Sequence, residues 1–444
     1  MSSTTAESVQ SPGAPDKVGS YRYFVLAALL VVYTLNFLDR QFLSVLAEPV
    51  KKSLHLTDTQ LGSITGLYFA LFYTVIGIPV GMLADRVNRV RIVTAACAIW
   101  SAFTAACGFA TSYVSLAIPR MGVGFGEAGG APPSYSIVSD YFPPRQRGTA
   151  LAIFSLGVPF GTMFGAMFGG YIAAAYGWQT AFKALGVVGL VIAPIFYFTV
   201  KEPPRGRYDG GSVEPAGNPL SVITSFISRP MLATTALACG LTAFVGYGML
   251  NWAPPLLMRA KGMKLQDVAL YYALMTGITG ALGTFASGAL VDWLGSKRPR
   301  AYAMVPAVSI LLSLPFLIAA VYAPNWQIAV MLLAGPNFLN NMYLAPALAV
   351  VQNAVNPRQR VVSGAVLLFV LNLIGLGGGP LFVGSMSDYF KGVHVAAGMA
   401  PAAASALGLQ QGLLSLAPFF IIAFLVQCVA GHFISTNAKR AKAA

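Results

Sequence analysis

The chain has 444 residues, of which 56% are hydrophobic and only 9% are charged, and its mean hydropathy is +0.69. A soluble globular domain carries about 25% charged residues, so this composition excludes a soluble protein and indicates a helical integral membrane protein. The net charge of +14 gives little support to a nucleic-acid partner, because most basic residues lie between apolar runs, where anionic lipid headgroups attract them.

Twelve apolar runs are each long enough to supply the ~20 helical residues that cross a bilayer. In chain order they cover residues 21–47, 58–84, 92–112, 113–141, 148–176, 178–200, 231–257, 267–293, 302–323, 327–355, 361–386 and 409–436. The polar segment 1–20 is predicted to be disordered and lacks the features of a secretory signal, so the first span acts as its own insertion signal. Basic residues favour the side that holds 1–20 and the basic tail 437–444, which places both termini in the cytoplasm.

The two halves of the chain contain matching motifs. GMLADRVNRVR (81–91) matches GALVDWLGSKR (288–298), PRQR (144–147) recurs at 357–360, and LTD (56–58) matches LQD (265–267). The offsets of 207, 213 and 209 residues are nearly constant, which indicates a duplicated unit. We therefore predict an all-α fold of twelve transmembrane helices in two pseudo-twofold six-helix halves, 21–200 and 230–436. The Pro- and Gly-rich segment 201–229 is predicted to be a cytoplasmic linker, as in a secondary transporter that alternates access between its halves.

The repeated GxxxD motif suggests a conformational latch. Its first copy has an acid and basic residues at the end of a span, and its second copy has a matching acid, which positive-inside charge does not explain. Such an acid can meet the N-terminus of a neighbouring helix in one conformation and leave it in the other. The proposed conformational latch consists of Gly81, Asp85, Arg86, Arg89, Gly288 and Asp292.

Ionisable residues inside the spans are few, and each is a functional candidate because it costs about 2.5 to 3.5 kcal/mol to insert. Asp39 and Arg40 lie in the first span, and Arg120 and Glu127 lie in the fourth. Burial favours a protonated carboxyl and a nearby arginine favours an ionised one, so protonation can respond to conformation. We hypothesise that Asp39 and Glu127 carry a coupling proton; the alternative is a set of ion pairs that only docks the two helices.

The stretch GVGFGEAGGAPP (122–133) contains the spacing GxGxxG of a dinucleotide-binding turn. Neither the preceding strand nor the later acidic residue that this motif requires is present. We interpret its glycines as small residues that let a neighbouring helix or a substrate approach the backbone near Glu127.

Four stretches of the sequence resemble known transporters. GMLADRVNRVR and LAIPRMGVGFGEA (116–128) resemble signatures of the major facilitator superfamily, although Asn88 stands where a glycine is usual. Residues 36–62 and 120–154 are similar to the Spinster family of lysolipid and sphingolipid transporters in its bacterial form. The resemblance implies functional roles for Asp39, Arg40 and Glu127, an amphipathic lipid-like substrate, and a bacterial inner membrane location.

Further site roles are predicted for charged, polar and aromatic residues of the spans. Arg40, Arg120 and Asn36 are candidates for a charge partner or a substrate headgroup ligand. Candidate cavity-lining residues are Tyr33, Tyr73, Tyr247, Asn251, Asn341 and Asn372. We expect a monomer without a cofactor or metal, driven by a proton gradient.

Other functions stay open at this point. NWAPP (251–255) also resembles anion symporters, which favours a transporter of small organic anions or drugs as the alternative. A non-transporting receptor has little need of titratable groups inside the membrane. An enzyme is disfavoured because no Ser/His/Asp or metal-ligand cluster is visible in the sequence. No function is assigned to the Ala- and Gly-rich segment 392–411.

Overall fold

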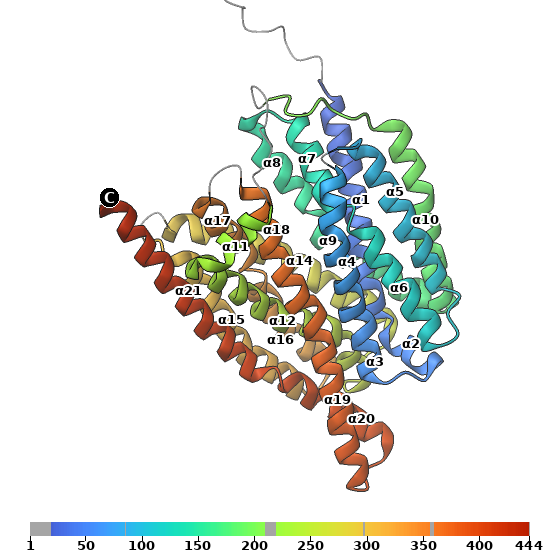
Figure 1. Cartoon of the computed structure of the whole chain (residues 1–444). Coiled ribbons are helices and arrows are strands. Elements are labelled where there is room, and N and C mark those ends of the chain that lie inside the picture. Colours follow the sequence, from blue (N-terminus) through green and yellow to red (C-terminus); the bar gives the residue numbers. More distant parts are fainter. Residues whose placement is uncertain (1–18, 85, 209–218, 296–297, 356–358, 444) are drawn as a thin grey trace, which may run out of the picture.

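The computed structural model describes residues 19–84, 86–208, 219–295, 298–355 and 359–443, and these form helices without a strand (Figure 1). The first half contains α1 (Tyr21–Val45), α2 (Ala47–Leu54), α3 (Asp58–Gly62), the π-helix η1 (Ser63–Leu67), α4 (Tyr68–Ala84), α5 (Arg89–Cys107), α6 (Tyr113–Glu127), α7 (Ala131–Tyr141), α8 (Pro144–Ser155), α9 (Gly157–Tyr176) and α10 (Trp178–Thr199). α11 (Pro219–Ser228) follows within the predicted linker, of which residues 209–218 lie outside the described residues.

The second half repeats this arrangement. It contains α12 (Pro230–Arg259), α13 (Leu265–Asp267), η2 (Val268–Tyr272), α14 (Ala273–Gly295), α15 (Ala301–Tyr322), α16 (Trp326–Asn340), α17 (Leu344–Ala354), α18 (Arg360–Val370), η4 (Leu371–Gly378), α19 (Gly379–Ala396), α20 (Pro401–Leu414) and α21 (Ala417–Ala443). In both halves a five-residue π-helix lies shortly after the repeated motif: η1 begins at Ser63, five residues after Asp58 of LTD, and η2 begins at Val268, directly after Asp267 of LQD. The sequence repeat is therefore also a repeat of local structure.

Eleven helices of the described part are long and apolar enough to cross a membrane. The predicted span 113–141 is missing from these because it is split into α6 and α7. Ser112 begins α6 with a capping box, and Pro132 and Pro133 lie in the first turn of α7, where a missing N–H costs nothing. The split leaves Glu127 as the last residue of α6, beside the break.

The last two predicted spans differ most from the structure. The span expected to end at 386 continues to Ala396 in α19, and the next begins at Pro401 in α20 instead of 409. The end of α19 and α20 pack together as a helical hairpin that projects beyond the other helices (Figure 1). The Ala- and Gly-rich segment 392–411 thus forms the outer part of this hairpin.

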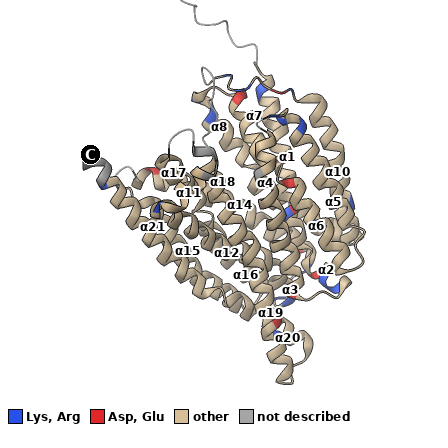
Figure 2. Ribbon diagram, in the orientation of Figure 1, with Lys and Arg blue, Asp and Glu red and all other residues tan. Residues whose placement is uncertain are grey.

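The two halves meet at one end of the bundle, where α2, α3 and α19 lie (Figure 1). We call this the distal end, formed by residues 47–62, 260–267 and 388–414, and the opposite end, with residues 142–148 and 200–208, the linker end. Close approach at the distal end needs Gly384, because a Cβ there would lie 2.3 Å from the carbonyl oxygen of Asp58. Charged residues gather at both ends, with a small group between α1, α4 and α6 (Figure 2).

Candidate functional site

Four charged side chains meet between α1 and α6, in the middle of the first half. Asp39 and Arg40 come from α1, whereas Arg120 and Glu127 come from α6. Asp39, Arg120 and Glu127 are at most 1% exposed. The structure therefore brings together all four ionisable residues that the sequence singles out inside the spans.

The ion pairs link the two helices crosswise. Arg120 Nη1 lies 2.8 Å from Asp39 Oδ1, and Arg40 Nε lies 2.7 Å from Glu127 Oε2. Thr104 of α5 donates a further hydrogen bond to the second oxygen of Asp39. Each carboxylate thus has an arginine on the other helix as its partner. Arg120 pairs with Asp39 and not with Glu127 of its own helix.

The two pairs differ in how fully they are satisfied. Both oxygens of Asp39 accept hydrogen bonds, but Glu127 Oε1 is buried without a partner among the described residues. The Arg40 side chain is 13% exposed, compared with 1% for Arg120. The Arg40–Glu127 pair is therefore the half of the site that is incompletely bonded and open on one side.

Aromatic rings surround the guanidinium of Arg40. Its Cζ atom lies 4.7, 4.9 and 4.6 Å from the ring centres of Phe37, Phe69 and Tyr73. Such rings attract a cation through their electron-rich faces. They hold Arg40 in place without using all of its N–H donors, so the guanidinium can still bind an anion.

The glycines of GVGFGEAGGAPP allow this geometry. A Cβ at Gly124 would lie 2.7 Å from the carbonyl oxygen of Phe69 in α4, and one at Gly126 would lie 2.6 Å from the backbone nitrogen of Trp100 in α5. The glycines therefore let α6 approach both neighbours closely, as the sequence indicates.

The predicted cavity-lining residues fall into two groups. Tyr33, Tyr73 and Tyr247 all border one hydrophobic cluster that contains Phe69 and Trp100. The asparagines differ, because Asn251 accepts a hydrogen bond from Ser44 and Asn341 donates one to the backbone of Asn337. Asn36 is buried beside the site, and Asn372 is half-buried in η4. The tyrosines therefore lie around the charged site, whereas Asn251 and Asn341 form bonds elsewhere.

The predicted latch residues lie at the linker end. Asp85 lies outside the described residues. Arg89 is buried and binds Asp140 of its own half at 2.5 Å and Glu202, at the start of the linker, at 2.6 Å. Gly81 and Gly288 make no close helix contact in this conformation, since nothing among the described residues lies within 4 Å of a Cβ built at either position. Arg86 and Asp292 are exposed. A latch between the halves would require another conformation.

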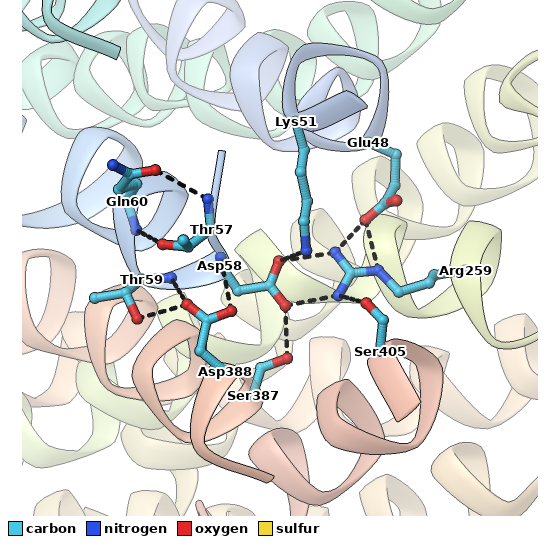
Figure 3. Close-up of polar contacts among 10 residues, drawn as sticks. All are labelled: Glu48, Lys51, Thr57, Asp58, Thr59, Gln60, Arg259, Ser387, Asp388 and Ser405. Atoms are coloured by element: carbon cyan, nitrogen blue, oxygen red, sulfur yellow. Dashed lines mark hydrogen bonds and ion pairs between the residues drawn. The ribbon is translucent and has the colours of Figure 1, made fainter. Parts of the chain in front are cut away.

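A second charged group, which we call the distal cluster, joins the halves and was not predicted. It consists of Glu48, Lys51, Asp58 and Arg259 (Figure 3). Arg259, from the second half, lies 2.5 Å from Glu48 and 2.6 Å from Asp58, both in the first. The sequence contains only 14 acidic residues, and this scarcity is the signal that could have drawn attention to Glu48 and Asp58.

Known proteins match nearly the whole chain. The sequence profile of the Major Facilitator Superfamily matches residues 29–380. An MFS-type efflux pump of Mycolicibacterium smegmatis is 33% identical over 376 residues, which cover 84% of this chain and 86% of that protein. A hexuronate transporter of Bacillus subtilis is 27% identical over 386 residues, which cover 84% of this chain and 90% of that protein.

A solved structure resembles this chain in both fold and sequence. It is a bacterial homologue of the human lysosomal transporter Spinster, in an inward-facing and unoccupied conformation, with a TM-score of 0.85 and 33% identity. The match covers 94% of this chain and 98% of that chain. These matches confirm the predicted fold class and show a multi-pass membrane transporter and not an enzyme. The chain belongs to the major facilitator superfamily and, within it, is of the Spinster type.

Proposed function

We propose that the protein is a proton-coupled secondary transporter that moves a lysophospholipid- or sphingolipid-like substrate by alternating access across a bacterial plasma membrane. Both termini are cytoplasmic in this proposal, a proton gradient is the energy source, and neither a cofactor nor a second subunit is needed. The observation that carries it is the Arg40–Glu127 pair, in which one carboxylate oxygen lies 2.7 Å from Arg40 and the other is buried with no hydrogen-bond partner in the described part of the chain.

Coupling follows from the shared arginine. An anionic headgroup that binds the partly exposed Arg40 competes with Glu127 for the same guanidinium. A fully buried carboxylate that loses its cation is too costly to keep ionised, so it takes up a proton. Substrate and proton binding are therefore linked through Glu127, and Asp39, with both oxygens bonded, supports the position of α6 through Arg120.

The substrate class rests on the surroundings of Arg40 and on the relatives. Aromatic rings on α1 and α4 form an apolar wall beside a cation, which suits a molecule with a charged head and a hydrocarbon chain. The similar solved structure is a bacterial homologue of Spinster, and the resemblance to the Spinster family implies a lipid-like substrate. Asn36 and Arg120 are proposed to support the headgroup site, and Gly81, Asp85, Arg86, Arg89, Gly288 and Asp292 to close the linker end in the opposite conformation.

Transport into proteoliposomes tests the proposal. Purified protein is reconstituted, and uptake of a labelled lysophospholipid is measured with and without an imposed pH gradient. We expect gradient-stimulated uptake that Glu127→Gln abolishes and that Asp267→Asn retains, because Asp267 lies at the distal end and has no ion pair among the described residues. Uptake by Glu127→Gln with the full pH response would refute proton coupling through this residue.

Small organic anions or drugs are the second candidate class. The similarity to a hexuronate transporter and to an efflux pump favours this alternative, and Arg40 would bind a small carboxylate equally well. The same vesicles should therefore be tested with a labelled hexuronate. Preference for the hexuronate over the lysolipid would overturn the lipid assignment and leave the proton-coupling test intact.

A further inference from the structure

Arg259 holds two carboxylates of the opposite half at once. Its Nη1 and Nη2 atoms lie 2.6 and 2.9 Å from the two oxygens of Asp58, and its Nε and Nη2 atoms lie 2.9 and 2.5 Å from Glu48 Oε1 (Figure 3). The planar guanidinium is suited to such a fork, which a lysine could not form. One side chain at the end of α12 thus ties α2 and α3 of the first half to the second.

The contact is buried and supported from both sides. The side chains of Arg259, Glu48 and Asp58 are 8%, 5% and 0% exposed. Asp58 also accepts hydrogen bonds from Lys51 and from Ser387 of α19. Asp388 of α19 accepts three bonds from the first residues of α3, two of them at 2.7 Å (Figure 3). The charges are therefore fixed by partners in both halves.

The sequence repeat provides a comparison within the same chain. At the offset of 207 residues, the position equivalent to Arg259 is Lys52, which is exposed. The counterpart of Asp58 in the LQD motif is Asp267, for which no ion pair occurs among the described residues. Arg259 and Asp58 thus form an ion pair between the halves, whereas their repeat-related counterparts Lys52 and Asp267 do not pair among the described residues.

Removing one partner of a buried ion pair leaves an uncompensated charge, whereas separating the halves returns all the charges to water. Loss of Arg259 therefore raises the free energy of the distal-closed state more than that of the distal-open state. We infer that Arg259 is the positioning residue that holds the distal end closed, and that its loss shifts the conformational equilibrium toward a distal-open state. The inference rests on alternating access in this fold, not on proton coupling or on the substrate.

Distances between spin labels test this directly. In a variant without the four native cysteines, labels are placed at the exposed distal positions Ser53 and Gln266, and in a second sample at Gln146 and Asn353 at the linker end. Double electron–electron resonance then reports each end separately, in detergent and without substrate. Arg259→Gln should raise the ratio of distal-open to distal-closed molecules by about tenfold or more, with shorter linker-end distances.

Matched variants separate the cluster from general charge effects. Lys52→Gln and Asp267→Asn, the repeat-related positions, should leave both distance distributions as in the parent protein. Arg259→Lys, which keeps the charge without the fork, should give an intermediate shift. If Arg259→Gln does not fold, the pair Glu48→Gln and Asp58→Asn removes the same contact and must produce the opening. Unchanged distal distances in either variant would overturn the inference.

Discussion

Ser44 and Asn251 form a buried hydrogen bond of 2.7 Å between the two halves, and they are 207 residues apart. This separation equals the offset between the GMLAD and GALVD motifs, so the two residues occupy equivalent positions in the repeat. The bond therefore joins the first helix of each half at the axis that relates them. Arg40 lies one turn before Ser44 in α1, and Glu48 lies four residues after Ser44, at the start of α2. The charged site, this bond and the distal cluster therefore follow one another along this part of the chain.

Substitution of Ser44 by alanine should weaken distal closure. It leaves the buried Asn251 Oδ1 without its donor, a loss of about 1 to 3 kcal/mol in the closed state. The distal label pair should then show a larger open population. Ser313→Ala is the control, because the hydroxyl of Ser313 is equally buried but bonds to its own helix at Ser309. An equal response of both variants would contradict a role for the bond between the halves.

The Arg120–Asp39 pair should matter for stability. Arg120→Met leaves a buried carboxylate unpaired, so the free energy of unfolding should fall by about 3 to 5 kcal/mol. The double variant Arg120→Met with Asp39→Asn should recover most of this loss, because it removes the charge as well. Thermal unfolding in detergent measures both. If the double variant is no more stable than Arg120→Met, the loss comes from packing and not from the charge.

Gly124 should not tolerate a methyl group. Gly124→Ala places a Cβ against the carbonyl oxygen of Phe69, a rigid backbone atom, and such overpacking costs about 1 to 3 kcal/mol. We expect a lower unfolding temperature for Gly124→Ala. Gly288→Ala has open space around its Cβ and should be neutral or slightly stabilising, since alanine favours helix over glycine. Equal melting temperatures for the two variants would disprove the close approach of α6 and α4.

Lys51 should make distal closure depend on pH. It lies in α2, outside the membrane spans, and burial together with the charge of Arg259 lowers its pKa, although Asp58 and Glu48 oppose the shift. On opening, its pKa returns toward the ordinary value of about 10.4. Between these two values the open state binds more protons, so raising the pH through this window should favour the closed state. The distal label pair should show this trend, and Lys51→Gln should remove it while Lys52→Gln keeps it.

The sequence was sufficient for the helical fold, the repeat and the four charges of the site, because hydropathy and intramembrane charge are visible in one chain. It left open which arginine holds which carboxylate, since Asp39 and Arg40 are adjacent and their directions depend on helix rotation. It missed the distal cluster because Glu48, Asp58 and Arg259 lie in separate loops or helix ends, where charge is ordinary. Only the packing of α3 against α19 shows that these residues become buried together.

The projecting hairpin of α19 and α20 gives a macromolecule access to this cluster from outside. The hairpin carries exposed apolar side chains, including Tyr389 and Val393, and at its base Asp388 and Ser405 contact Thr59 and Arg259. An antibody fragment that binds the hairpin would therefore act on the same helices whose residues contact Thr59 and Arg259. Its binding could then favour or oppose closure of the distal end. Such a fragment, selected for preference between Arg259→Gln and the parent protein, would serve as a conformation-specific inhibitor that never enters the transport pathway.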